Sequence, residues 1–189
     1  MPTVSENLTV SGHSLDDLVR SFEYSSYREN LFEQIFCSEL LQGCWRAGLG
    51  PIEIDRPFVD FQGYDLVATC GAVVRHIQLK GSRGGQLAIH RRLAAKPSAC
   101  VVNLVSRVTS DGTRIEFDYY FFGAPPGQAL DISGLAPARK AFNTRQVDNT
   151  FAKVERANHV RLPQARFDGP LSIADLANRL FGSAPTDAG

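Results

Sequence analysis

Two strand-like runs near the middle of the chain constrain the fold more than any other feature. Residues 99–108 and 114–122 are rich in β-branched and aromatic side chains, and the turn-forming sequence Ser110-Asp111-Gly112 separates them. Two such runs joined by a short turn that contains glycine predict an antiparallel hairpin. The sequence therefore predicts a β-sheet at the centre of the fold.

The segments around this hairpin predict helices and further strands. Apolar residues recur at three- and four-residue intervals over 27–46, as in a helix that buries one face. The other expected elements are a short helix opening at Ser14, a short strand over 51–58 whose Pro57 indicates a sheet edge or a strand end, a hairpin of strands over 63–70 and 73–80, a helix over 86–95, and a capped C-terminal helix after Ser172. Helix, three strands, helix and two strands predict an α/β sandwich with a mixed central sheet.

Composition limits the class of protein. The 189 residues, 43% hydrophobic and 21% charged, suit one soluble globular domain with an appendage. We divide the chain into an N-terminal segment over 1–26, a core over 27–130 and a basic C-terminal extension over 131–189 that packs on the core. No apolar run approaches the roughly 18 residues of a membrane span, and the N-terminus lacks the features of a secretory signal, so we expect a cytoplasmic protein without a membrane partner.

The four cysteines, Cys37, Cys44, Cys70 and Cys100, form no C-x-x-C pair and have no histidine at zinc-like spacing. This pattern predicts free, mostly buried thiols in a reducing compartment.

Charge is distributed unevenly along a chain whose net charge is zero. Residues 1–70 contain 4 Lys and Arg against 11 Asp and Glu, whereas residues 71–189 contain 16 against 9. Basic residues are most frequent over 137–167. Such asymmetry permits an anionic partner on one face, although scattered solvated charge would give the same count.

Polar residues on two neighbouring strands point to a chemical site. In the strand over 73–80, alternation places Gln78 and Lys80 on the same face. On the preceding strand Asp65 lies among apolar neighbours, where a carboxylate is costly unless it is paired or binds a cation. An aspartate, an amide and a lysine on paired strands are suited to hold a metal ion beside a group that stabilises charge.

These residues resemble the PD-(D/E)xK nuclease superfamily. The matching segments are FEQIFCSELL (32–41), GYDLV (63–67) and IQLKG (77–81), and the resemblance covers roughly residues 27–122. It implies the restriction-endonuclease-like fold, a three-layer sandwich with a mixed central sheet flanked by helices. It also implies that Asp65, Glu33 and the Leu79 backbone carbonyl hold Mg²⁺ or Mn²⁺, and that Lys80 positions or activates the attacking water.

The sequence departs from the general motif at Gln78, where the family has Asp or Glu. A neutral amide is a weaker ligand for a hard cation than a carboxylate, so the two-metal form of the reaction is in doubt. A Q-x-K sequence resembles the Mrr-type restriction enzymes, whose first helix carries a Phe-Glu pair like Phe32-Glu33. In such a site Gln78 would hydrogen-bond the water.

The resemblance implies a Mg²⁺-dependent nuclease that hydrolyses phosphodiester bonds in DNA, in defence, restriction or repair. We expect flanking phosphates to contact Arg91, Arg92, Arg145, Lys153 and Arg156, and cutting both strands with one site per chain would favour a homodimer. The rival hypothesis is a nuclease-fold module that binds nucleic acid or a partner protein without cutting. A third is an unrelated α/β protein in which the motif occurs by chance.

Each candidate also has a plainer interpretation. Glu29 lies one turn before Glu33 and competes for its role, Asp60 competes with Asp65, and Lys80 could be a surface lysine at a strand end. Arg91 and Arg92, with His90, contact phosphate or merely coat a helix. His76 is expected to be structural, and the aromatic run over 119–122 is expected to pack in the core.

Overall fold

A computed structural model describes residues 14–59, 62–81, 86–147 and 150–182 of the chain. Six strands form the main sheet, in the order β1-β2-β3-β5-β6-β9. They are β1 (Glu53–Asp55), β2 (Leu66–Cys70), β3 (Val73–Gly81), β5 (Ala99–Val108), β6 (Ile115–Gly123) and β9 (Asp168–Leu171). Only β3 and β5 of this sheet pair in parallel, and the other neighbours are antiparallel, so the expected mixed sheet is present.

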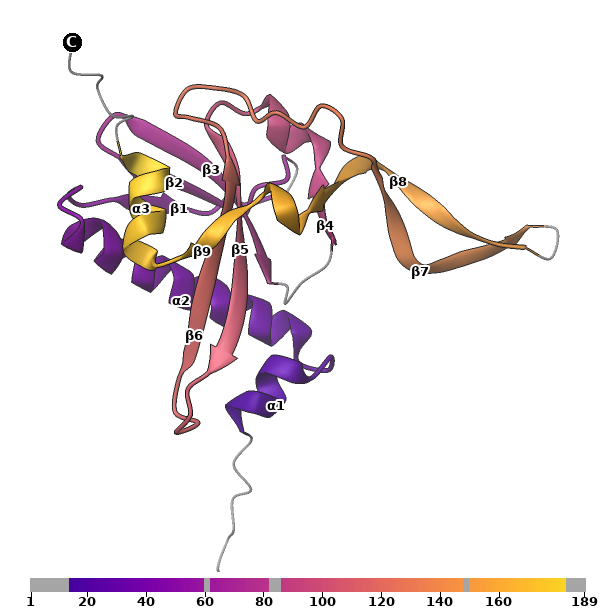
Figure 1. The fold of residues 1–189 in the computed structure, drawn as a ribbon, viewed down its shortest axis with the longest axis horizontal. Helices are drawn as coiled ribbons and strands as arrows, with labels where there is room; N and C mark the ends of the chain where they lie inside the picture. The colour runs from indigo at the N-terminus through magenta and orange to yellow at the C-terminus, as the bar shows by residue number, and fades with distance from the viewer. Residues whose placement is uncertain (1–13, 60–61, 82–85, 148–149, 183–189) are drawn as a thin grey trace, which may run out of the picture.

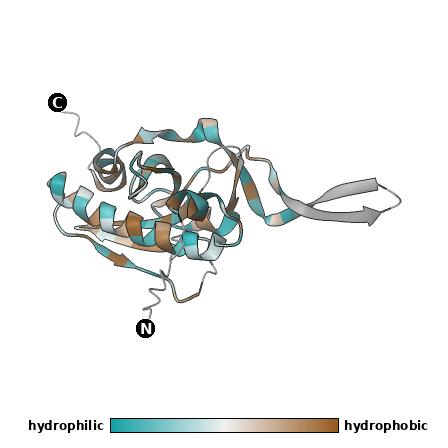
Figure 2. Cartoon of the chain, turned by 90° about the horizontal axis from the view of Figure 1, so that it is seen from below, coloured by the Kyte–Doolittle hydropathy of each residue, from teal (hydrophilic) through white to brown (hydrophobic). Residues whose placement is uncertain are grey.

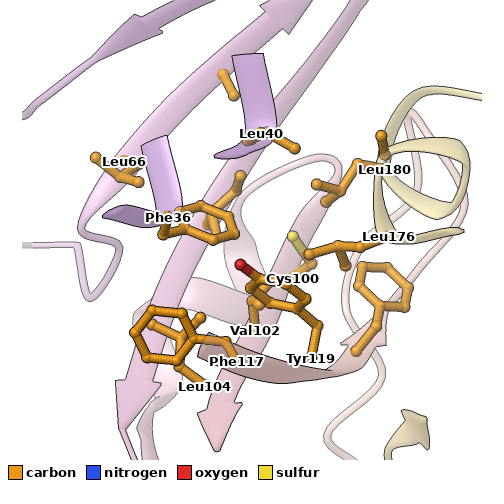
Figure 3. Close-up of a cluster of buried hydrophobic side chains, with 14 of the residues drawn as sticks. Phe36, Leu40, Leu66, Cys100, Val102, Leu104, Phe117, Tyr119, Leu176 and Leu180 are labelled. Carbon is orange, nitrogen blue, oxygen red and sulfur yellow. The ribbon is translucent and has the colours of Figure 1, made fainter. Parts of the chain in front are cut away.

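Three helices cover one face of the main sheet: α1 (Leu15–Arg20), α2 (Ser25–Arg46) and α3 (Ile173–Phe181). Hydrophobic and hydrophilic residues alternate along α2 (Figure 2), because one side of the helix meets the sheet and the other meets solvent. Phe36 and Leu40 of α2 pack over Leu66 and Val102 of the strands, and Leu176 and Leu180 of α3 complete the cluster (Figure 3).

The other face of the main sheet is covered by a second, three-stranded sheet in the order β4-β8-β7. Its strands are β4 (Gln86–His90), β8 (Thr150–Pro163) and β7 (Pro137–Val147), and the 3₁₀ helix η1 (Arg91–Ala95) follows β4. Leu87, Ile89, Val160 and Leu162 of this sheet pack on Ala99 and Val101 of β5. A last 3₁₀ turn, η2 (Gln164–Arg166), leads from β8 to β9.

The predicted fold class is confirmed: the structure is an α/β sandwich with a mixed central sheet, and its order agrees with the expected helix, three strands, helix and two strands except at the second helix. The predicted edge position of the 51–58 strand is also confirmed, since β1 is the outermost strand. The expected helix over 86–95 is wrong. Alternation of Leu87 and Ile89 with Ala88 and His90 gives an extended strand with one buried face, and only residues 91–95 are helical.

Two smaller expectations are confirmed. All four cysteines are free, and three of them are buried. Burial raises the pKa of the Cys44 thiol to about 11 and that of Cys100 to about 12. In the aromatic run, Tyr119 and Phe121 are buried in the helix-side cluster, while Tyr120 and Phe122 pack against the cluster on the other face.

Among the described residues, none of the helices has the length and apolar character needed to cross a membrane. The proposed division of the chain at residues 26 and 130 stays a prediction.

A buried arginine connects β3 to the C-terminal helix. The Arg75 guanidinium donates to the carbonyl oxygens of Leu180 (2.6 Å), Ala124 (2.6 Å) and Arg179 (3.2 Å), and the residue is 1% exposed. Two of these carbonyls belong to the last turn of α3, which has no intrahelical donor for them. Arg75 therefore fastens α3 to the sheet.

We expect Arg75→Met to lower the free energy of unfolding by at least about 3 kcal/mol, because it removes charge-assisted bonds and leaves buried carbonyls unsatisfied. Urea unfolding measures the loss. The exposed Arg179→Ala, which removes only a surface ion pair with Asp168, is the control and should cost under about 1 kcal/mol. Equal losses in the two variants would contradict this role of Arg75.

Candidate active site

Asp65 lies directly before β2, and its contacts fix the start of that strand against β3. Its backbone N–H donates to the Ile77 carbonyl (2.8 Å), and its carboxylate Oδ2 accepts the backbone N–H of Leu79 (2.6 Å). The side chain thus takes the place of a main-chain acceptor at the end of the strand pair. This bond holds a half-buried carboxylate beside the residue that precedes Lys80.

A pocket of about 360 Å³ opens at this point between α2, β3 and β4. It is lined by Glu29, Phe32, Glu33, Asp65, Leu79, Lys80, Gly81, Leu87 and Leu104. The structure therefore brings Asp65, Lys80, Leu79 and Glu33 together, from segments up to 47 positions apart in the sequence. Glu29, the alternative to Glu33, lines the same pocket. Asp60, the alternative to Asp65, lies outside the described residues.

Gln78 does not line the pocket, although it lies between the two residues that Asp65 contacts. It is 5% exposed, and its side-chain Oε1 is buried without a hydrogen-bond partner. A buried amide oxygen without a partner costs about 1–3 kcal/mol, so this atom keeps an unused capacity to accept a hydrogen bond.

Glu33 has a partner that the sequence did not indicate. Its Oε1 lies 2.7 Å from Nε of Arg56, which follows β1. The guanidinium offsets the negative charge of Glu33 and competes with any cation for that carboxylate. No sequence signal identifies Arg56, because it lies 23 residues from Glu33 in a segment without a motif.

Asn103 is a second residue that sequence reasoning missed. It is fully buried in β5 and is paired in register with Lys80 of β3. A polar residue within the apolar run Val101-Val102-Asn103-Leu104 was a visible signal, since a buried amide in a strand requires hydrogen-bond partners.

The side chains at the pocket supply some of the ligands that a divalent cation needs. Carboxylates of Asp65 and of Glu29 or Glu33 are the oxygen ligands that Mg²⁺ and Mn²⁺ prefer. Within the described part of the chain, no group of three His, Cys, Asp or Glu side chains is close enough to hold a metal on its own. Backbone carbonyls, water or substrate phosphate would have to complete the coordination.

The expected phosphate contacts lie on the side of the sheet that carries β4. Arg91 and Arg92 are exposed in η1, and Arg156 is exposed in β8. Arg145 is in β7 and Lys153 in β8, and their side chains are outside the described residues. His76, expected to be structural or peripheral, has its ring edge-on against Tyr64 and its Nδ1 in contact with the Pro97 carbonyl.

No family model and no curated protein sequence matches the chain. Among solved structures, it is similar to Hjc of Archaeoglobus fulgidus, a Holliday junction resolvase from an archaeal hyperthermophile. The sequences are 16% identical, the match covers 74% of this chain and 98% of that chain, and the TM-score is 0.37. The fold assignment therefore rests on the element order and strand pairing described above.

The unpartnered oxygen of Gln78 makes a testable prediction. Gln78→Glu buries a carboxylate in a position that is 5% exposed, so without metal we expect a lower melting temperature at pH 7 and a raised pKa for the new acid. Millimolar Mn²⁺ should restore more of that stability than it adds to the wild type. Thermal unfolding with and without Mn²⁺ measures the loss of stability and its recovery.

Gln78→Met is the matched control, since it keeps the side-chain length and removes the unpartnered oxygen. We expect it to cost less than about 1 kcal/mol. A large loss in Gln78→Met, or an absence of any Mn²⁺ effect in Gln78→Glu, would contradict the position assigned to this side chain.

The ion pair between Glu33 and Arg56 leads to a further testable prediction. If Glu33 is a metal ligand, Arg56→Ala releases its carboxylate and should tighten Mn²⁺ binding several-fold, while stability changes by less than about 1 kcal/mol because the pair is partly exposed. Titration calorimetry measures the affinity. In the Glu33→Gln background the same Arg56→Ala change should have a much smaller effect, and an equal effect in both backgrounds would remove Glu33 from the ligand set.

Proposed function

We propose that this protein is a metal-dependent nuclease that hydrolyses phosphodiester bonds in DNA. The observation that carries the proposal is the convergence of Asp65 and Lys80, with Glu29 and Glu33, on one pocket at the end of β3. An acidic group for a cation beside a lysine for the developing charge is the set that phosphodiester hydrolysis requires. The fold class and the Q-x-K sequence of β3 are those expected from the resemblance to the PD-(D/E)xK nucleases.

Each residue has a distinct part in the proposed reaction. Asp65 and Glu33, with the Leu79 carbonyl, would hold a Mg²⁺ or Mn²⁺ ion, which when bound polarises a phosphate and lowers the pKa of water. The Lys80 ammonium would orient the attacking water and offset the negative charge that grows on the phosphate oxygens. Gln78 would accept a hydrogen bond from a water through its unpartnered Oε1.

The rival function is a module that binds nucleic acid or a partner protein without cutting. The contact between Glu33 and Arg56 favours this alternative, because it leaves one of the acidic groups already neutralised. The two functions differ in what Asp65 and Lys80 do, so the same variants separate them.

The test is cleavage of plasmid and of a linear single strand with Mg²⁺ or Mn²⁺. Lys80→Ala should reduce the rate at least about 100-fold and leave Mn²⁺ affinity nearly unchanged, because lysine is not a ligand. Asp65→Asn should reduce both the rate and the affinity. Lys96→Ala, a lysine outside the pocket that lies over the Tyr64 ring, is the control and should cut at the wild-type rate.

A wild type that binds DNA but never cuts, with Mn²⁺ affinity indifferent to Asp65→Asn, would overturn the nuclease proposal and support the binding module. Circular dichroism of each variant shows whether a loss of cleavage comes from unfolding.

A further inference from the structure

Strands β7 and β8 form a two-stranded antiparallel ribbon that extends away from the body of the molecule (Figure 1). β7 has 11 residues and β8 has 14, and among the strands that the structure describes β7 pairs only with β8. At about 3.4 Å per residue, the part of β7 beyond Pro137 spans roughly 30 Å. A two-stranded ribbon has no core of its own and is marginally stable in water, so an element of this length is best explained by a partner that it contacts.

The ribbon is anchored to the layer that covers the candidate active site. The C-terminal part of β8 pairs with β4, from Gln86 opposite Pro163 to His90 opposite His159. Leu87 of β4 lines the pocket that contains Asp65 and Lys80. One continuous strand, β8, therefore links the base of the ribbon to the wall of that pocket.

Charge identifies the kind of partner. Between Pro137 and Pro163 the sequence has six basic residues, Arg139, Lys140, Arg145, Lys153, Arg156 and Arg161, against the acidic residues Asp148 and Glu155. The rest of the chain has 14 Lys and Arg against 18 Asp and Glu. Arg139, Arg156 and Arg161 are exposed. Ribbons from two copies of the chain would repel each other, whereas a polyanion would attract them.

We propose that the β7–β8 ribbon is a binding arm that enters the major groove of double-stranded DNA. The major groove is about 12 Å wide and admits a two-stranded β-ribbon, whose strands lie 4.7–4.9 Å apart. A single strand offers no groove, so the ribbon selects duplex DNA. This inference rests on the proposed function for the choice of DNA, and it names the duplex as the substrate class.

Binding without cleavage tests the arm separately from the active site. The probe is a fluorescent 24-base-pair duplex, or one of its strands, in EDTA, followed by anisotropy between 50 and 300 mM salt. The ribbon variant combines Lys140→Gln, Arg145→Gln and Lys153→Gln. The control variant combines Arg20→Gln, Arg46→Gln and Arg114→Gln, three exposed positions away from the ribbon with the same change in net charge.

We expect the ribbon variant to bind the duplex at least tenfold more weakly at 100 mM salt than the control variant does. The slope of log affinity against log salt should fall by about three, since each phosphate contact contributes about 0.9. The wild type should prefer the duplex to the single strand. Equal affinities of the two variants, or no preference of the wild type for the duplex, would overturn the proposal.

The groove is tested with a duplex in which every cytosine carries a 5-glucosyloxymethyl group, because these sugars fill the major groove. We expect wild-type affinity to fall to that of the single strand. Unchanged affinity would mean that the ribbon does not enter the major groove.

The outcomes also separate this inference from the nuclease proposal. A ribbon variant that binds like the control while the wild type cuts plasmid DNA would reject the arm and keep the nuclease. A wild type that binds duplex through the ribbon but never cuts would keep the arm and reject the nuclease.

Discussion

The parallel pairing of β3 with β5 is the constraint on which the rest of the structure depends. Two parallel neighbours can be joined only by a chain that crosses over one face of the sheet. Here the crossover consists of β4 and η1 instead of an α-helix. The presence of a strand in the crossover has two consequences. First, β4 contributes Leu87 to the pocket at the end of β3, where Lys80 lies. Second, because β4 is a strand, one of its edges can pair with β8. The pocket wall and the base of the ribbon are thus products of one connection.

The sequence predicted the central sheet well because its strands carry strong local signals. The run over 99–108 supplies both faces of β5, with Cys100 and Val102 in one cluster and Ala99 and Val101 in the other. The helix expected over 86–95 is wrong because the strand-like spacing of Leu87 and Ile89 covers too few residues to separate the strand period from the helix period. Pairing with β8, more than 60 residues later, decides the outcome, and no local pattern contains that information.

The candidate site also combines residues that the sequence could predict with contacts that only tertiary packing determines. Asp65 and Lys80 were accessible to prediction because Asp65 lies directly before β2 and Lys80 lies in β3, and the pairing of β2 with β3 forces proximity. Arg56 was not, because its contact with Glu33 depends on how the end of β1 lies against α2. The burial of the Gln78 oxygen without a partner is likewise a result of tertiary packing. The sequence shows which polar side chains the chain contains. Tertiary packing decides which of them form ion pairs, as Glu33 does, and which keep an unpartnered atom, as Gln78 does.

The contacts of Arg75 and α3 have a consequence for the order in which the molecule can assemble. The helix-side cluster contains residues from Val19 to Phe181, so its members span nearly the whole described chain. During synthesis α1, α2 and the strands from β1 to β6 emerge before α3, the helix that completes the cover of their apolar face. Until then the Arg75 guanidinium has no helix end to bind, and Leu176 and Leu180 are missing from the core. A fragment that ends before α3 therefore has an open hydrophobic face, and the main core is completed only when α3 has been added.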